Sequence, residues 1–152
     1  MDLKIKKEHK NFKMPTKATR GSAGFDCYVA DYFFSDGSLW YNLGFSMELP
    51  EGYFALVTSR SSIVKTSGIQ ANCVGVIDTD YRGIWHFVMR PLNKWSEQLI
   101  GEIVQKEDNL IPYNIGDRCC QFFVLPILDI TLSEHSSLTS TNRNGGFGST
   151  GK

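Results

Sequence analysis

The sequence carries two aspartates two residues apart, Asp78 and Asp80, in the stretch Asp-Thr-Asp-Tyr. A carboxylate can act as a general base that takes a proton from water, so either side chain could activate a nucleophile. Aspartate is also common in turns, where its side chain hydrogen-bonds to nearby backbone groups. Taken alone, the pair favours a turn, and a catalytic role needs support from the surrounding sequence.

A glycine-rich segment near the C-terminus could bind phosphate. Residues 146–152 read Gly-Phe-Gly-Ser-Thr-Gly-Lys and satisfy most of the P-loop pattern, in which backbone N–H groups surround phosphates. A P-loop also needs a strand before it, and a Ser or Thr and a helix after the lysine. Because Lys152 is the last residue of the sequence, these features do not follow it, and we reject that interpretation. Such a tail can still close over a phosphate chain with backbone donors and hydroxyls. A disordered end is the alternative.

Short β-rich runs separated by turns must position these groups. Leu43, Phe45, Met47 and Leu49 alternate with small or polar residues, which is the period of a strand with one buried face. Residues 53–58, 84–90 and 120–128 are further aromatic or aliphatic runs bounded by Gly, Pro or Ser. The pattern predicts an all-β barrel or sandwich.

Three other segments complete the predicted organisation. A short helix is expected over residues 62–67, with Ser61 or Ser62 as its cap and Gly68 at its end. Residues 94–111 are polar, carry charges of both signs and are expected as an insertion loop in a core of residues 1–132. Residues 133–152 are rich in Ser, Thr, Asn and Gly, so we expect a flexible lid arm that orders on a ligand or partner subunit.

Composition limits the class of partner. The 16 Lys and Arg residues balance 16 Asp and Glu, so no net charge directs the chain to nucleic acid or an anionic membrane. Without a membrane-length apolar run or a signal-peptide pattern, we expect a soluble, cytoplasmic protein. Cys27, Cys73, Cys119 and Cys120 lack metal-ligand spacing and are expected to be reduced packing residues, the last two on opposite faces of a strand.

Five segments, taken in order, resemble the motifs of the trimeric dUTPase family. They are residues 23–26 (AGFD), 59–62 (SRSS), 72–83 (NCVGVIDTDYRG), 116–121 (GDRCCQ) and 145–151 (GGFGSTG). The third segment is the most specific. The resemblance implies a jelly-roll, β-barrel-type subunit and a homotrimer with active sites shared between subunits. It also implies hydrolysis of dUTP to dUMP and pyrophosphate, which limits uracil in DNA and supplies dUMP for thymidylate synthesis.

The resemblance further implies the roles of the acidic residues. Asp78 corresponds to the base that holds the water attacking the α-phosphorus, and Gln121 to the glutamine that positions this water or a phosphate. Asp80 is expected to be structural. A Mg²⁺ ion chelated by the triphosphate is implied, with Asp26 reaching it through a water. The alternatives are a turn for Asp26 and a strand-end hydrogen bond for Gln121.

The phosphate contacts that the resemblance implies come from Arg118, from the loop Arg60, Ser61 and Ser62, and from Gly148, Ser149 and Thr150 in the tail. Ser62 stands where the family often has glycine, so its contact is expected through the backbone N–H. A surface ion pair is the alternative for Arg118. Arg143 resembles the tail arginine that reaches the γ-phosphate, but it lies four residues before Phe147 where the family has five. Its reach is therefore in question.

The base and sugar contacts that the resemblance implies are Asn72, the backbone of Val76, Ile77 and Asp78, and the rings of Tyr81 and Phe147. Backbone groups and Asn72 would read the uracil edge, and Phe147 would cover the base. Tyr81 would leave no room for a ribose 2′-hydroxyl, with ordinary packing as its alternative. Residues 72–83 resemble the hairpin that receives the uracil edge in the family. His86 lies across this hairpin and either lines the base pocket or is a half-exposed strand histidine.

Two other functions stay open at this point. A dCTP deaminase shares the fold and the Arg-Ser-Ser loop, but it needs a glutamate base after the hairpin, and residues 84–96 contain no carboxylate. The other is a regulatory protein that uses the scaffold to sense nucleotide, through residues 94–111. A pure binding protein has no need for a base poised on water, which favours the enzyme.

Overall fold

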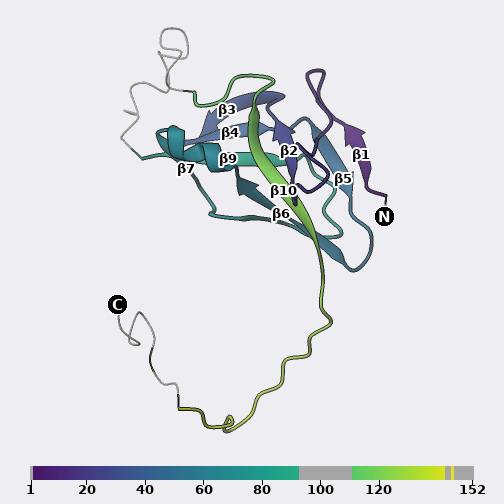
Figure 1. Cartoon of the computed structure of the whole chain (residues 1–152), viewed down its shortest axis with the longest axis vertical. Coiled ribbons are helices and arrows are strands. Elements are labelled where there is room, and N and C mark those ends of the chain that lie inside the picture. The colour runs from purple at the N-terminus through teal and green to yellow at the C-terminus, as the bar shows by residue number, and fades with distance from the viewer. Residues whose placement is uncertain (1, 93–110, 143–144, 146–152) are drawn as a thin grey trace.

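The structure is a computed structural model that describes residues 2–92, 111–142 and 145 of the chain. Two four-stranded antiparallel sheets and one two-stranded sheet form the described fold (Figure 1). The first sheet has the order β2 (Phe25–Tyr28), β10 (Arg118–Pro126), β6 (Tyr53–Ser59), β8 (Gly75–Ile77). The second has the order β3 (Asp31–Ser35), β4 (Ser38–Asn42), β9 (His86–Pro91), β7 (Gly68–Gln70), and β1 (Lys4–Lys7) pairs with β5 (Phe45–Glu48). The predicted all-β class is confirmed.

Aromatic side chains fill the core. The buried Trp85 ring lies 5.2 Å from the centroid of Phe45 and 5.3 Å from that of Phe122. Tyr41 stacks with Phe87, and its hydroxyl accepts the backbone N–H of Tyr113 at 3.2 Å. Because Phe45 and Phe122 come from different sheets, their shared contact with Trp85 packs those sheets against each other.

The strongest sequence signals correspond to observed strands. Leu43, Phe45, Met47 and Leu49 are all buried, as their alternation predicts. Strands β6 and β9 fall on the predicted runs, while β10 begins two residues earlier than expected, at Arg118. Strands β1, β2, β3, β4 and β7 were not predicted, because they are short and their side chains do not alternate cleanly in polarity.

The predicted short helix is present in a different form. It is the 3₁₀ helix η1 (Ser61–Lys65), its N-cap is Arg60, and no side chain makes a capping hydrogen bond. The prediction of Ser61 or Ser62 as cap is therefore wrong. Gly68 does not close the helix but begins β7, where a Cβ atom would lie 2.8 Å from the Met89 methyl group.

Two expectations about the cysteines are wrong. The pairing of β10 with β2 shifts register between Arg118 and Cys120, and this irregularity leaves Cys119 and Cys120 both buried. Their sulfur atoms lie 3.8 Å apart rather than on opposite faces of the strand. Cys73 is exposed rather than packed. All four cysteines are free, as expected.

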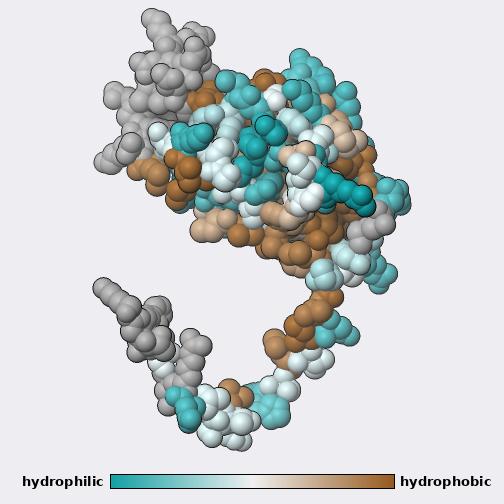
Figure 2. All heavy atoms as spheres, viewed as in Figure 1, coloured by the Kyte–Doolittle hydropathy of each residue, from teal (hydrophilic) through white to brown (hydrophobic). Residues whose placement is uncertain are grey.

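The chain leaves the sheets after β10. Every described residue beyond this strand is exposed, and Figure 1 shows the segment running away from the barrel. Apolar side chains recur in its first part, which is brown in Figure 2. The division into a core and a lid arm at residue 132 stays a prediction, as does the cytoplasmic location. Within the described residues, no helix has the length and hydropathy that a membrane span requires.

We predict that Gly44→Ala lowers the free energy of unfolding by about 2–4 kcal/mol, because strain and overpacking combine there. Gly44 has a φ of +77°, and an added Cβ would lie 2.6 Å from the Cβ of Ala30. Gly52→Ala is the matched control, since Gly52 has a φ of +78° and no atom within 4 Å of an added Cβ. Urea unfolding at one protein concentration measures both, and equal losses would contradict the packing argument.

Candidate active site

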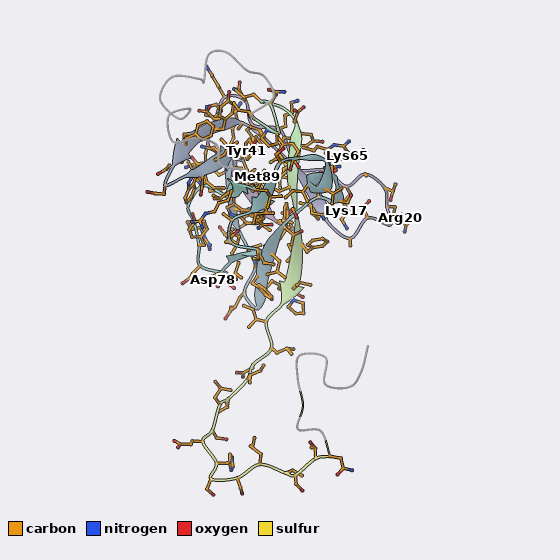
Figure 3. All side chains as sticks on the ribbon, turned by 90° about the vertical axis from the view of Figure 1, so that its left-hand side faces the viewer. Lys17, Arg20, Tyr41, Lys65, Asp78 and Met89 are labelled. Carbon is orange, nitrogen blue, oxygen red and sulfur yellow. The ribbon has the colours of Figure 1, made fainter. Side chains whose placement is uncertain are left out.

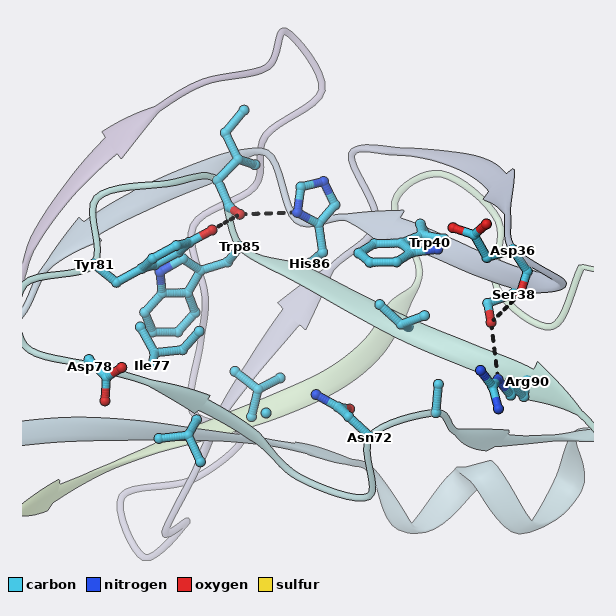
Figure 4. Close-up of a pocket in the computed structure, with 16 residues that line it drawn as sticks. Asp36, Ser38, Trp40, Asn72, Ile77, Asp78, Tyr81, Trp85, His86 and Arg90 are labelled. Carbon is cyan, nitrogen blue, oxygen red and sulfur yellow. Dashed lines mark hydrogen bonds between the residues drawn. The ribbon is translucent and has the colours of Figure 1, made fainter.

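An open pocket of about 540 Å³ lies between the two large sheets (Figure 4). The predicted base and sugar residues line it together: Asn72, Val76, Ile77, Asp78, Tyr81 and His86. The same pocket is lined by residues of β4 and β9 that the sequence did not indicate, including Trp40, Ser38 and Arg90. The structure thus gathers one half of the predicted site in a single cavity.

Asp78 follows β8 directly and begins the loop that leads to β9. Strand β8 pairs with β6, which places Ile77 opposite Ala55. The Thr79 hydroxyl donates to the Tyr53 carbonyl at 2.6 Å, and Arg82 donates to the Thr79 carbonyl at 2.7 Å. These bonds fix the loop. Among the described residues, the Asp78 carboxylate has no ion-pair partner within 4 Å, so its oxygens can accept from a water.

Tyr81 and His86 share one hydrogen-bond acceptor, the backbone carbonyl of Ile84. The Tyr81 hydroxyl donates to the Ile84 carbonyl at 3.2 Å, and His86 Nδ1 lies 3.0 Å from the same oxygen. A Cβ at Gly83 would collide with the Tyr81 hydroxyl, so glycine is required for this ring position. The expectation that His86 lies across a hairpin is wrong, because β8 and β9 belong to different sheets. His86 nevertheless lines the pocket.

Burial governs the charge of His86. Its imidazole packs edge-on against Trp40 and Phe33, with ring centroids 6.0 Å apart in each pair. Desolvation by these neighbours lowers the pKa of His86 below its ordinary value of 6.5, against a smaller opposing effect of the Ile84 carbonyl. Since a carbonyl can only accept, Nδ1 carries the hydrogen, and the ring is neutral at pH 7.

A second open pocket, of about 420 Å³, is lined by some of the residues predicted to contact the phosphates or the metal, but not by Arg118 or Ser62. Asp26, Arg60, Ser61 and Gln121 line it together with Gly24. The Asp26 side chain is 13% exposed, and its two oxygens accept from Arg60 Nε at 2.8 Å and Arg118 at 3.1 Å. We call Asp26, Arg60, Arg118 and Gln121 the phosphate cluster. The surface ion pair expected as an alternative for Arg118 is thus present.

Gln121 is held in one orientation beside this cluster. Its Nε2 donates to the Ser59 carbonyl at 3.2 Å, and its Oε1, next to Gly24, accepts no hydrogen bond from another described residue. A Cβ at Gly24 would lie 3.2 Å from that oxygen. Arg60 also donates to the Ser62 hydroxyl at 3.3 Å, which ties the guanidinium to the start of η1.

The two pockets lie apart in one chain. They share no lining residue, and Figure 3 shows Asp78 on the opposite side of the molecule from Lys17 and Arg20. Those basic residues lie in the same short stretch, residues 17–22, as Ala18 and Ser22, which line the second pocket. A single chain therefore does not bring Asp78 to its own phosphate cluster.

Some predicted site residues lie outside the described part of the chain: Arg143, Phe147, Gly148, Ser149 and Thr150, together with residues 94–110 of the insertion. Others were missed by sequence reasoning. Trp40, Ser38 and Arg90 reach the first pocket only because β4 pairs with β9, a long-range contact that has no local signal. The buried Gln70 was also missed, because a single glutamine forms no sequence motif that indicates a site.

Comparison with known proteins identifies the family. Residues 10–151 match the sequence model of the dUTPase family. The chain belongs to the dUTPase family. The deoxyuridine 5'-triphosphate nucleotidohydrolase of Hydrogenobaculum sp. (strain Y04AAS1) is 31% identical over 156 residues, which cover 99% of each chain. The corresponding protein of Anaplasma marginale (strain St. Maries) is 35% identical and covers 91% of this chain and 88% of its own length.

Solved dUTPases share the fold. The Staphylococcus bacteriophage 80alpha dUTPase with dUPNHPP superposes with a TM-score of 0.78 at 24% identity, covering 99% of this chain and 98% of its own. A dUTPase from phage phi11 of S. aureus, studied for the coordination of a structural Mg(II) ion, gives 0.71 at 22% identity and covers 92% and 100%. The predicted dUTPase family and jelly-roll fold are confirmed, and the deaminase alternative is not favoured.

We predict that the free energy of unfolding falls as the pH is lowered from 7.5 to 5.5, in part through His86. Its pKa is depressed in the folded state, so the unfolded chain binds the proton more readily below about pH 6.5. In urea unfolding at both pH values, His86→Gln should reduce this loss of stability. Equal pH dependence in the His86 variant and the parent protein would refute the assignment.

Proposed function

We propose that this chain hydrolyses dUTP to dUMP and pyrophosphate in a homotrimer, with Asp78 as the general base. The observation that carries the proposal is the position of Asp78. Its carboxylate lines the pocket that Asn72, Tyr81 and His86 also line, and it is not neutralised by any described cation. A base beside this cavity of about 540 Å³ suits attack on the phosphate nearest the sugar.

The chemical step transfers a water oxygen to the α-phosphorus. Asp78 accepts one proton of the water as the new P–O bond forms, and the bond to the bridging oxygen breaks to release pyrophosphate. Gln121 presents its Oε1 acceptor, which suits a hydrogen of this water better than a phosphate oxygen. Arg60 and Arg118 would stabilise the charge that develops on the phosphates.

Mg²⁺ is proposed as the cofactor, held by the triphosphate with Asp26 outside the first coordination shell. Each Asp26 oxygen already accepts from an arginine but keeps a lone pair for a metal-bound water, so the residue fits this role. The described residues contain no group of three or more His, Cys, Asp or Glu side chains that could hold a metal by themselves. When bound, the ion would neutralise charge on the departing pyrophosphate.

Substrate selection is assigned to the first pocket and the tail. Asn72 and the backbone from Val76 to Asp78 would contact the uracil edge, and Tyr81 would exclude a ribose 2′-hydroxyl. We also propose that Phe147 covers the base while Gly148, Ser149 and Thr150 close on the phosphates. This closure would exclude water other than the nucleophile. The reach of Arg143 to the γ-phosphate stays a prediction.

Two features support assembly with other copies of this chain. The pocket with Asp78 and the phosphate cluster lie apart in one chain, so a neighbouring chain must supply the missing half of each site. The segment after β10 carries Leu128, Ile130 and Leu132, which are 72%, 68% and 93% exposed and alternate with polar residues. This is the pattern of a strand with one apolar face, which a partner subunit would bury.

Asp78→Asn tests the proposed base. We expect pyrophosphate release from dUTP to fall by about 10²- to 10⁴-fold while nucleotide binding persists, because only the proton acceptor is removed. Steady-state kinetics and equilibrium binding of a non-hydrolysable dUTP analogue provide the two measurements. Asp80→Asn is the matched control and should retain turnover. Unchanged turnover in Asp78→Asn would remove this residue from its role.

Ile130→Asp tests the assembly. A carboxylate on the apolar face of the segment should dissociate the trimer, because burying an unpaired charge is costly. Sedimentation velocity at micromolar concentration reports the change in mass. Thr131→Asp places the same charge on the alternate face and should leave the trimer intact. If both variants kept the parental mass, the segment would not be part of the interface.

A further inference from the structure

Gln70 is a buried amide at the end of β7, with 7% of its surface exposed. Its Oε1 accepts the backbone N–H of Ser59 at 2.8 Å. Its Nε2 donates to the Val57 carbonyl at 3.0 Å and to Asn72 Oδ1 at 3.1 Å. The side chain therefore connects β6 with the Asn72 amide that lines the base pocket.

The chemistry of these partners permits only one orientation of Gln70. A backbone N–H can only donate and a backbone carbonyl can only accept, so Ser59 and Val57 fix which end of the amide is oxygen and which is nitrogen. The second hydrogen of Nε2 then faces Asn72, and the Asn72 atom that meets it must be its oxygen. The polarity of Asn72 is thus set by two peptide groups of β6 through Gln70.

This polarity directs a donor into the pocket. With Oδ1 bound to Gln70, the Asn72 NH₂ group lies over Gly75, whose added Cβ would be 3.5 Å from Nδ2. Figure 4 shows the Asn72 nitrogen facing the centre of the pocket. A bare glycine at position 75 leaves this space open. The side chain offers hydrogens, not a lone pair, to a ligand.

We infer that Gln70 is a positioning residue for base specificity. It holds the Asn72 amide so that its NH₂ group can donate to a carbonyl of the base, whereas an exocyclic amino group at the same place would be repelled. The inference rests on the proposed function. Uracil presents the O4 acceptor where cytosine presents an amino donor, so cytosine would place two donors against each other. Buried polar groups left unpaired discriminate strongly between otherwise similar ligands.

Gln70→Met tests the inference, because methionine has a similar shape and cannot fix the Asn72 amide. We expect the ratio of kcat/KM for dUTP over dCTP, measured by pyrophosphate release, to fall by about tenfold or more. The change should appear mainly in KM, since Gln70 does not touch the reacting atoms. Ser46→Ala is the control: it removes the hydrogen bond from the buried Ser46 hydroxyl to Glu8, which shares no residue with this network, and should keep the ratio.

Asn72→Asp provides a second test if Gln70→Met does not fold. This variant retains an acceptor for Gln70 but presents a carboxylate oxygen to the pocket, so the preference should shift from dUTP toward dCTP. A folded Gln70→Met protein with the parental ratio, or Asn72→Asp with an unchanged preference, would overturn the inference. A parent protein without dUTP preference would instead overturn the proposed function, so the two failures are distinguishable.

Discussion

Pairing of β6 with a strand on each side is the constraint on which both halves of the site depend. On one edge its register with β10 places Ser59 opposite Cys120, next to Gln121, and its next residue is Arg60. On the other edge its register with β8 places Ala55 opposite Ile77, so that Asp78 follows immediately. A one-residue slip would reverse the faces of these side chains and dismantle both pockets.

The same strand supplies the backbone groups that orient the polar side chains. The Ser59 carbonyl accepts from Gln121 and the Ser59 N–H donates to Gln70, so both backbone polar groups of this β6 residue are bonded to side chains. The Tyr53 carbonyl, at the other end of β6, holds Thr79 beside Asp78. Because these anchors are backbone atoms within a sheet, the site is preorganised rather than assembled by the ligand.

Sequence reasoning succeeded where a signal is local. The motif in residues 72–83 predicts that Asn72, Asp78 and Tyr81 belong to one site, and all three line one pocket. The alternation around Phe45 predicts a strand whose apolar residues are buried, as they are. It failed where position depends on distant pairing. The irregular register at Cys120 and the approach of Trp40 to His86 both follow from strand contacts across the chain. The ion pair between Asp26 and Arg60, the N-cap residue of η1, likewise joins residues that are distant in the sequence.

In the proposed homotrimer, the separation of Asp78 from the phosphate cluster makes assembly part of catalysis, and subunit complementation tests this most directly. Asp78→Asn and Arg118→Ala chains, each inactive alone, are unfolded together, refolded as mixed trimers and assayed for pyrophosphate release from dUTP. If the halves come from different chains, about a quarter of the sites in a random 1:1 mixture combine two intact halves, and activity returns. A mixture of confirmed mixed trimers that stays inactive would contradict the account.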